Sequence, residues 1–530
     1  MDATTTVSME MELPWGARCA GLAFFAFSVC LAALGVVLLV ARRWPWCSCH
    51  VCRAYLTGSW AREFTNLGDW YAHLLRRSPT GTVHVHVLGC TVTANPANVE
   101  HMLRTRFDNF PKGRPFAALL GDLLGDGIFN VDGHAWRHQR KMASLELGSV
   151  AVRSYAYKII AQEVEARLMP VLADAADRGA VLDLQDVFRR FAFDNICKIS
   201  FGLDPGCLDR EMPVSELADA FDAASRLSAM RGAAASPLLW RAKRFLNVGS
   251  ERELRKAIKV VDELAAAMIR ERQKLGVGSS HDLLSRFMAS TGVDDAAADD
   301  KFLRDIVVSF LLAGRDTVST ALTTLFMLLS KNPEVAAAMR AEAEAGDGGE
   351  TGAAITYEHL KGLHYTHAVL HENMRLFPPV QFDSKFCAAA DFDSKFCAAA
   401  DVLPDGTYVG GDARVMYHPY AMGRMPHIWG ADYAAFRPAR WLTGPGASFV
   451  PANPYKYPVF QAGQRVCLGK ELAVTEMKAA SVAVVRAFDV EVVGENGRSG
   501  GAAAAPRFVP GLTASISGGL QVRVRRRVHT

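Results

Sequence analysis

The sequence predicts a mainly α-helical protein with small β-sheets and a single N-terminal transmembrane helix. Half of its 530 residues are hydrophobic and 22% are charged, a globular composition with ample material for a large core. From residue 98 onward, apolar residues recur at i, i+3, i+4 and i+7, as in segments 149–172 and 252–275. Residues 81–94 alternate like two short strands joined at a glycine. No stretch has the composition of a long interdomain linker, so we expect one large domain.

An uncharged apolar run of 23 residues, 19–41, stands near the N-terminus. As a helix it would be roughly 34 Å long, enough to span a bilayer. Arg42 and Arg43 follow it directly, so the positive-inside rule places most of the chain in the cytosol. A cleaved signal peptide is the alternative, but the run is long for one and its N-terminal flank is net acidic. The expected divisions are a lumenal segment, an anchor, a juxtamembrane hinge and the main domain, at 1–18, 19–41, 42–60 and 61–530.

The hinge contains the sequence "WCSCHVC", in which Cys47, Cys49, His50 and Cys52 are residue types that bind zinc. A structural zinc site usually has a second ligand pair at a defined distance, and the sequence shows none. The simpler interpretation is a set of juxtamembrane cysteines. The total of eleven cysteines is odd and does not indicate a disulfide framework, which favours a reducing compartment.

The charge balance excludes one class of partner. The chain has 59 Lys and Arg against 55 Asp and Glu, a net charge of +4. This excess is mild, and no basic tract has interleaved aromatic residues. The basic C-terminal sequence "VRVRRRVHT" is short and is read as a solvated terminus. We therefore expect no nucleic-acid partner.

The strongest chemical signal is Cys467, which lies in a glycine-bracketed loop immediately before an amphipathic helix. Gly463 would allow a tight turn, and Gly469 would allow the backbone to approach a flat group closely. The following helix N-terminus would lower the pKa of the Cys467 thiol. Arg465 can pair with carboxylates of a ligand. The loop predicts a thiolate for a metal or an electrophile; the alternative is a buried structural cysteine.

Phe460, Gly463, Arg465, Cys467 and Gly469 stand in the pattern F-x-x-G-x-R-x-C-x-G. This pattern resembles the haem-binding loop of the cytochrome P450 family, in which the cysteine is the proximal iron ligand. The resemblance implies the cytochrome P450 fold, haem b with an axial thiolate from the loop cysteine, and O₂ as co-substrate. It also implies electrons from NADPH through a reductase of the endoplasmic reticulum membrane, where the chain would be a single-pass protein. An axial thiolate favours O–O cleavage.

Other segments resemble family elements in the same order. "HENMR" and "FRPARW" supply Glu372, Arg375 and Arg440, which correspond to the buried salt-bridge triad that stabilises the family's core. A zinc-protease reading of "HENMR" fails, because Arg375 stands where the second histidine is required. "GHAWRHQRK" matches the family's W-x-x-x-R through Trp136 and Arg140, which the resemblance assigns to a haem propionate.

"LLAGRDTVST" resembles the part of the family's central helix that crosses the oxygen side of the haem. Gly314 would permit a local opening of the helix. Thr317 could then hydrogen-bond dioxygen or a water, and Asp316 could act as an acid in proton delivery. The alternative for Thr317 is an inert hydrogen bond to its own helix.

The substrate is expected to be apolar with a carboxylate end. Lys112 and Arg114 are candidate partners of that carboxylate, although both could be solvated surface residues. Val380 and Phe382 fall in "LFPPVQFDSKF", which in the family forms a strand lining the substrate pocket. Segments such as "SWAREFTNLGDWYAHLLRRSPT" resemble the plant subgroup that oxidises fatty-acid ω-ends and jasmonoyl-isoleucine, in its carboxylating branch. Two other classes stay open: a haem-thiolate isomerase or dehydratase, and a non-catalytic membrane-anchored protein.

The ten-residue unit "FDSKFCAAAD" occurs twice in tandem, at 382–401. Because ten is even, the insertion preserves which face of a strand looks inward. We expect the extra copy to extend a hairpin loop, at little cost if the loop is flexible. The rival hypothesis is that it disturbs the core and prevents haem loading, which would make the protein non-catalytic. A sequence-assembly error or a recent duplication without a role is the third possibility.

Overall fold

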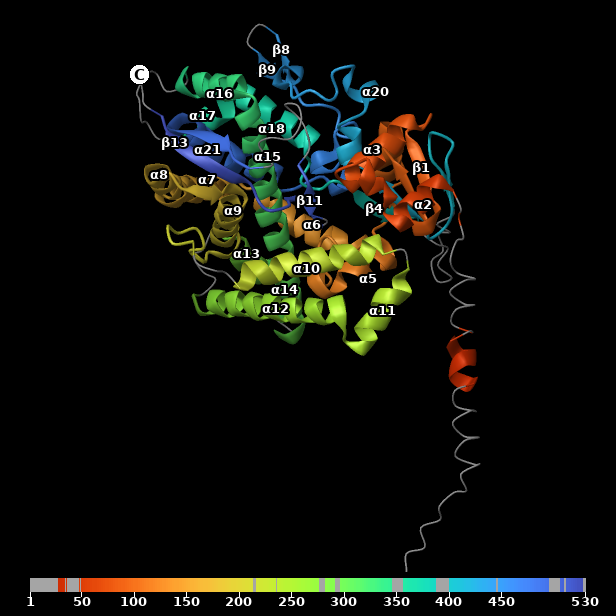
Figure 1. The fold of residues 1–530 in the computed structure, drawn as a ribbon. Helices are drawn as coiled ribbons and strands as arrows, with labels where there is room; N and C mark the ends of the chain where they lie inside the picture. The colour runs from red at the N-terminus through yellow and green to blue at the C-terminus, as the bar shows by residue number, and fades with distance from the viewer. Residues whose placement is uncertain are drawn as a thin grey trace, which may run out of the picture.

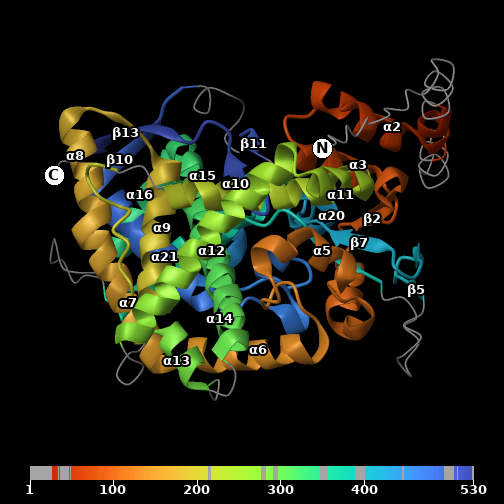
Figure 2. The ribbon, with the colours of Figure 1, turned by 90° about the horizontal axis from the view of Figure 1, so that it is seen from below.

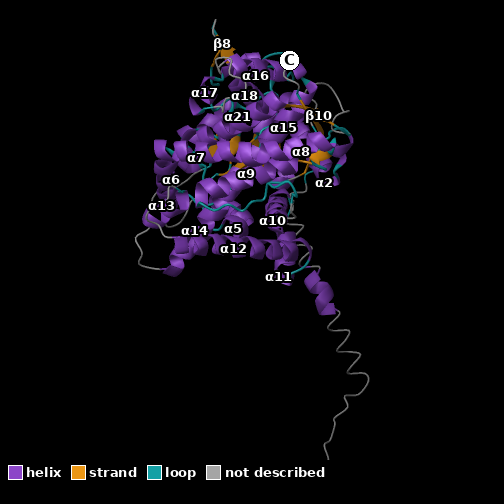
Figure 3. Cartoon of the chain, turned by 90° about the vertical axis from the view of Figure 1, so that its left-hand side faces the viewer, coloured by secondary structure: helices purple, strands orange, loops and turns teal. Residues whose placement is uncertain are grey.

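The computed structural model describes residues 27–33, 35, 47, 49–212, 216–234, 236–275, 282–290, 296–345, 356–387, 400–444, 447–494, 506–509 and 511–527. Helices dominate these residues and the strands are short, as Figure 3 shows in purple and orange. The predicted fold class, mainly α with small sheets, is confirmed.

A long helix crosses the middle of the molecule (Figure 1). It consists of α14 (Ala296–Leu311), the π-helical turn η6 (Leu312–Asp316) and α15 (Thr317–Lys331). Nearly every residue of α15 is buried, because its sequence is apolar or hydroxyl-bearing on all sides. Most of its hydroxyls bond within the central helix; Thr323, for example, donates to the carbonyl of Ser319 at 2.6 Å. Thr320 instead donates to the carbonyl of Ala514 at 2.6 Å.

Helices enclose this central helix at both ends. α10 (Glu216–Ala233) and α12 (Gly249–Leu275) lie across α14, on the side that Figure 2 faces. α9 (Leu184–Phe201) runs beside η6 and α15, and the rings of Phe188 and Phe326 stack 5.4 Å apart. α16 (Pro333–Ala345), α18 (His364–Leu376) and α21 (Lys470–Ala487) complete the core at the other end.

The remaining helices mostly cover the surface of this core. The α-helices are α2 (His50–Thr57), α3 (Leu67–Arg77), α4 (Pro96–Glu100), α5 (Gly113–Leu124), α6 (Gly133–Leu147), α7 (Val150–Glu163), α8 (Met169–Arg178), α11 (Pro237–Leu246), α13 (Leu283–Ser290), α17 (Tyr357–Gly362), α19 (Pro419–Met422) and α20 (Pro426–Trp429). The 3₁₀ and π turns are η1 (Ser59–Arg62), η2 (His86–Leu88), η3 (His101–Thr105), η4 (Phe107–Asn109), η5 (Val164–Leu168), η7 (Pro438–Trp441), η8 (Pro458–Phe460) and η9 (Gly463–Arg465). The predicted helix at 252–275 lies within α12, and the one at 149–172 continues from α7 through η5 into α8.

A four-stranded sheet joins distant parts of the chain in the order β1-β2-β7-β4. Its strands are β1 (Thr82–Val85), β2 (Cys90–Thr93), β7 (Arg414–Tyr417) and β4 (Asp383–Phe386). β2 and β7 are parallel, whereas the other two pairs are antiparallel. β1 and β2 form the hairpin predicted at 81–94. The smaller sheets are β10-β13-β3 (Phe488–Val492, Gln521–Arg526, Val181–Asp183), β11-β12 (Phe508–Val509, Ser515–Ile516), β5-β6 (Asp401–Val402, Tyr408–Val409) and β8-β9 (Leu442–Thr443, Ser448–Phe449).

The first copy of the tandem repeat forms β4, and the last residue of the second copy, Asp401, begins β5. The backbone N–H of Cys387 continues the strand pairing by donating to Ala413 at 2.9 Å. The Nδ2 atom of Asn109 contacts both the Sγ atom of Cys387, at 3.8 Å, and the Oδ2 atom of Asp401, at 3.0 Å. The two ends of the intervening segment therefore lie side by side. Residues 388–399 themselves lie outside the described residues.

The predicted anchor falls mostly outside the described residues. Positions 27–33 and 35 are helical, with Phe27, Val29 and Leu31 exposed. Among the described residues, the one helix long and apolar enough to cross a membrane is Asp300–Lys331, of whose most apolar window 78% is buried inside the protein. That segment is the central core helix. The anchor at 19–41 and the lumenal segment at 1–18 stay predictions.

Candidate active site

The Cys467 loop folds back on itself. The backbone N–H of Cys467 donates to the carbonyl of Phe460 at 2.8 Å and closes the loop just before α21. Gly463 has φ +61°, and a Cβ atom there would collide with the carbonyl oxygen of Leu103 in η3. The predicted tight turn at Gly463 is confirmed, since only glycine fits both the angle and the close contact. A Cβ on Gly469, the residue before α21, would meet no protein atom within 4 Å.

The thiol of Cys467 is accessible to solvent although protein atoms surround it closely. Burial raises the pKa of the thiol, while the N–H of Gly469 and the charges of Arg140 and Lys470 act in the opposite direction. The sequence led us to expect a net lowering, and that expectation is wrong for the protein alone, because desolvation outweighs the helix terminus. A bound metal ion would deprotonate the thiol outright.

The central helix presents an accessible strip. Ala313, Gly314 and Thr317 are half-buried, while most of α15 is buried. The predicted opening of the helix is present as the π-helical turn η6. Gly314 has a second role that the sequence did not indicate. A Cβ atom there would lie 2.5 Å from side-chain atoms of Ile196 in α9, so the close helix packing itself requires glycine.

The hydroxyl of Thr317 donates to the carbonyl of Ala313 at 2.6 Å. This is the intrahelical bond that sequence analysis named as the alternative. The bond uses the hydroxyl proton and leaves the oxygen lone pairs free to accept from a water.

Asp316 is buried beside Arg315, whose Nη1 atom donates to its carboxylate at 2.8 Å. Burial raises the pKa of Asp316, and the charge of Arg315 opposes this shift. Arg315 also donates to Asp222 at 2.6 Å, and the side chain of Asp222 is partly exposed. Asp316 therefore binds a proton more readily than an ordinary aspartate, and ion pairs connect it to the surface.

Three predicted propionate-binding residues come together. The guanidinium carbons of Arg465 and Arg140 lie 4.6 Å and 5.7 Å from the ring centroid of Trp136. Arg465 donates to Asp132 at 2.6 Å, and Arg140 donates to the carbonyl of Val466 at 2.7 Å. Arg140 therefore contacts the loop that contains Arg465 and Cys467, and the three residues form one group.

Residues 63–499 match the model of the family "Cytochrome P450". The chain belongs to the cytochrome P450 family. It is 54% identical to cytochrome P450 94C1 of Arabidopsis thaliana, over 92% of this chain and 95% of that protein. It is 47% identical to cytochrome P450 94B3 of Arabidopsis thaliana, over 87% and 88%, and 41% identical to cytochrome P450 94A2 of Vicia sativa, over 87% of each. The solved haem domain of cytochrome P450DA shares the fold, with a TM-score of 0.66 at 21% identity, over 83% of this chain and 88% of that one.

This protein is thus a cytochrome P450 monooxygenase of the plant 94 group. Family membership implies a haem-thiolate cofactor and a reductase partner. Whether the residues present fit a haem can be judged from their charges.

Two cations that the sequence did not assign to the haem lie near Arg465. Lys112 forms a buried ion pair with Asp383 of β4, and Lys385 lies 3.4 Å from the same carboxylate. Lys112 and Lys385 are 7% and 1% exposed, and burial depresses the pKa of Lys385 strongly. Lys112 was expected at the substrate carboxylate or on the surface. The surface expectation is wrong, because Lys112 is buried against Asp383, and its role toward the substrate stays a prediction. Arg114 is exposed in the first turn of α5.

The charges beside the Cys467 loop fit the two propionates of a haem. Four basic side chains, Lys112, Arg140, Lys385 and Arg465, lie near two carboxylates, those of Asp132 and Asp383, so the basic groups outnumber the acidic ones by two. Burying unpaired charge is costly, so a dianionic ligand would stabilise the cluster and keep Lys385 protonated. The accessible thiol and the open space over Gly469 fit the same ligand. We call these six residues the propionate cluster.

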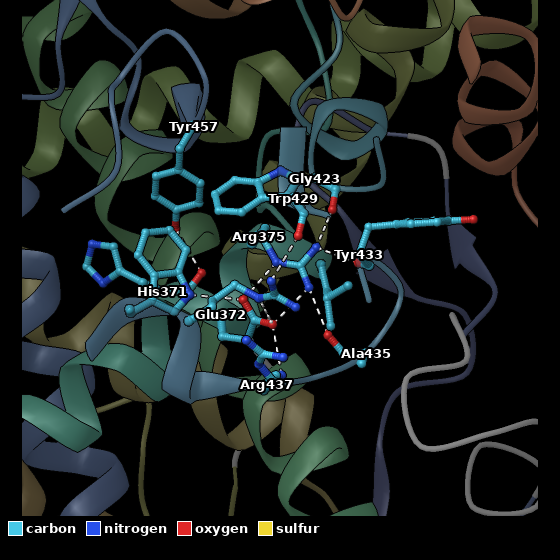
Figure 4. Close-up of polar contacts among 12 residues, drawn as sticks. His371, Glu372, Arg375, Gly423, Trp429, Tyr433, Ala435, Arg437 and Tyr457 are labelled. Atoms are coloured by element: carbon cyan, nitrogen blue, oxygen red, sulfur yellow. Dashed lines mark hydrogen bonds and ion pairs between the residues drawn. The ribbon is translucent and has the colours of Figure 1, made fainter. Parts of the chain in front are cut away.

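The salt-bridge triad of this P450 is fully formed (Figure 4). The carboxylate of Glu372 is completely buried and accepts from Arg375 at 2.7 and 2.8 Å and from Arg440 at 2.8 Å. It also accepts from the indole of Trp441 at 2.9 Å and the backbone N–H of Arg437 at 2.8 Å. The predicted grouping of Glu372, Arg375 and Arg440 is confirmed.

The remaining N–H groups of Arg375 donate to backbone carbonyls. They contact the carbonyls of Gly423, Tyr433 at 2.7 Å and Ala435 at 2.9 Å, all visible in Figure 4. The hydroxyl of Tyr457 donates to the carbonyl of His371 at 3.1 Å, which ties α18 to the segment leading into the Cys467 loop. The triad thus fixes α18 against residues 423–441, and the Tyr457 bond connects α18 to the segment before the loop.

The remaining substrate candidates lie where β4 begins. Val380 is half-buried and Phe382 is 41% exposed, whereas all four residues of β4 are buried. Both stay candidates for the substrate-facing wall.

Proposed function

We propose that this P450 performs ω-oxidation of an apolar substrate with a carboxylate end, namely jasmonoyl-isoleucine and its 12-hydroxy form, in hormone catabolism. The observation that carries the proposal is the 54% identity to cytochrome P450 94C1 over 92% of the chain, together with the resemblance to the carboxylating branch of the plant ω-oxidases. A fatty-acid ω-hydroxylase is the second candidate, because both reactions oxidise the far end of a carboxylate-bearing chain.

In this proposal Cys467 ligates the iron of haem b, and the propionate cluster, with Trp136, binds the carboxylates of the haem. The bound haem would activate O₂ with electrons from NADPH. Thr317 positions a water in the η6 opening, and Asp316, whose pKa burial raises, delivers protons to that water. Val380 and Phe382 form part of the apolar wall, and the exposed Arg114 is the remaining cation for the substrate carboxylate.

We further propose that the chain is a single-pass protein of the endoplasmic reticulum with its catalytic domain in the cytosol. Support comes from the apolar run 19–41 followed by Arg42 and Arg43. A membrane-bound NADPH reductase would dock on the cysteine side of the haem. Separation of membranes expressing the chain, followed by protease protection, tests this topology: the domain after residue 60 should be digested from the cytosolic side.

The function is tested with membranes that contain the full chain, a reductase and NADPH. Jasmonoyl-isoleucine should gain one oxygen, and the 12-hydroxy form should be converted to the acid. Fatty acids run in parallel distinguish the second candidate. Oxygen uptake that follows product formation separates a monooxygenase from an isomerase or dehydratase, and failure to oxidise any carboxylate-bearing substrate would refute the proposal.

A further inference from the structure

Three cysteines from the hinge converge at the start of α2. The Sγ atoms of Cys47, Cys49 and Cys52 all lie within 4.8 Å of one another. Among the described residues, no other group of three potential metal ligands lies this close together. Sequence analysis set a metal site aside because no second ligand pair was visible. The structure removes that objection, since three ligands already meet without one.

The sulfur atoms are held in place by the backbone. Cys49 precedes α2, and its Sγ accepts from the N–H of Cys52 at 3.4 Å. The Sγ of Cys52 accepts from the N–H of Val87, in η2 of the catalytic domain, at 3.3 Å. N–H donors to sulfur stabilise thiolates and orient them, which is what supporting hydrogen bonds do around metal centres. Cys52 is fully buried, whereas Cys47 and Cys49 are half-buried and open to a metal from solvent.

We propose that Cys47, Cys49 and Cys52 bind one thiophilic d¹⁰ cation. Zn²⁺ is the expected ion, and Cu(I), which also binds thiolates, is the alternative. Sulfur ligands about 2.3 Å from zinc lie roughly 3.8 Å apart in a tetrahedral site, within the observed separation. A solvent molecule would fill the fourth position on the open side. His50 is exposed at the first position of α2 and is not part of the cluster.

A metal fits this cluster better than a disulfide. A disulfide would use two of the three sulfurs and leave the third without a role, and disulfides are rare in the cytosol, where the domain is proposed to lie. Binding displaces the thiol protons to solvent and consumes no oxidant. The bound ion would link Cys47 and Cys49 to Cys52, whose Sγ accepts from the N–H of Val87 in η2 of the catalytic domain. It would thereby strengthen the attachment of the hinge to that domain.

The full chain, purified in detergent with its haem, is stripped with a chelator under a non-thiol reductant and then offered one equivalent of Zn²⁺. We expect one zinc per chain by elemental analysis, with X-ray absorption showing three sulfur neighbours at about 2.3 Å. The variants Cys47→Ser and Cys49→Ser should each weaken zinc binding, measured against a chromophoric indicator, by more than the roughly 10–100-fold that losing a supporting hydrogen bond costs. A parallel titration with Cu(I) decides between the two ions.

Cys207→Ser is the matched control, because Cys207 is also half-buried and lies outside the cluster; it should retain zinc. Because Cys52 is buried, Cys52→Ser could disturb folding and is not needed for the test. The haem spectrum of each variant reports that the domain is intact. The proposal would be overturned if the intact domain bound neither metal, or if Cys47→Ser bound zinc as tightly as the wild type. Mass spectra that showed these cysteines acylated or joined as a disulfide would also overturn it.

Discussion

The salt-bridge triad and the propionate cluster are both buried groups of charges, yet they are completed differently. In the triad, Glu372 accepts from five donors, and the extra charge of Arg375 is met by three backbone carbonyls. In the propionate cluster, Lys112 and Lys385 share the single carboxylate of Asp383. The triad is thus satisfied by the protein alone, whereas the cluster needs an external anion. One region stabilises the fold, and the other stabilises the fold only together with its ligand.

The largest expected effect comes from breaking the triad. Glu372→Ala would leave Arg375 buried without a carboxylate and Arg440 with only the more distant Asp432, at 3.3 Å. Loss of one partner of a buried ion pair costs about 3–5 kcal/mol. We expect little folded protein and no haem spectrum. The matched control is Arg437→Ala, because Arg437 contacts Glu372 only through its backbone N–H while its side chain is largely exposed. Thermal unfolding compares the two; similar stability loss in both would contradict the role of the carboxylate.

Substitution of Lys385 sharpens the comparison, because its effect should change sign with the ligand. Lys385→Met removes a poorly paired buried cation, so the haem-free chain should unfold at the same or a higher temperature. The haem-loaded chain should lose about 1.5–3 kcal/mol, at least about tenfold in haem affinity, through the lost charged hydrogen bond. Haem transfer to apomyoglobin measures the affinity.

The tandem repeat supplies the control for that experiment. Lys395 is the counterpart of Lys385 in the second copy, and β4 is formed by the first copy. Lys395→Met should therefore be silent. If neither single substitution weakened haem binding and only the double substitution did, the two copies would be exchanging places in the strand.

Gly314→Ala tests the packing between the central helix and α9. Its Cβ would lie 2.5 Å from Ile196 side-chain atoms, and overpacking of this kind costs about 1–3 kcal/mol. In the Ile196→Ala background, where the clashing side chain is absent, Gly314→Ala should destabilise the protein less than it does in the wild type. Denaturant unfolding of the four chains gives the coupling, and additive effects would show that the glycine is needed for another reason.

The smallest effect is expected from deleting one repeat copy. Because the copies are identical, deletion of 382–391 or of 392–401 gives the same chain. Cys387 and Asp401 both contact Asn109, so their separation is already short, and three alanines remain to join the ends. Shortening the loop about fourfold should raise stability by about 1 kcal/mol or less. If the wild type contained little haem and the deletion raised that content, the result would instead favour the rival hypothesis that the extra copy prevents haem loading.

The triad and the Cys467 loop were predicted because their short motifs resemble those of the cytochrome P450 family, in which the same residues have these roles. The location of Gly314 was predicted, but its contact with Ile196 was not, since that contact joins residues far apart in the chain. Lys112 was misplaced for the same reason: its partner, Asp383, lies in β4. The Cys47 cluster was set aside because a sequence shows the spacing of cysteines but not the distances between their sulfurs.

The central claim, that Cys467 supplies an axial thiolate to a haem held by this 530-residue chain, is tested most directly by one spectrum. The reduced, carbon-monoxide difference spectrum of membranes expressing the chain should show the family's red-shifted thiolate band, and Cys467→Ser should abolish that band. A band of the same position in Cys467→Ser, or no band in the intact, well-expressed chain, would contradict the account.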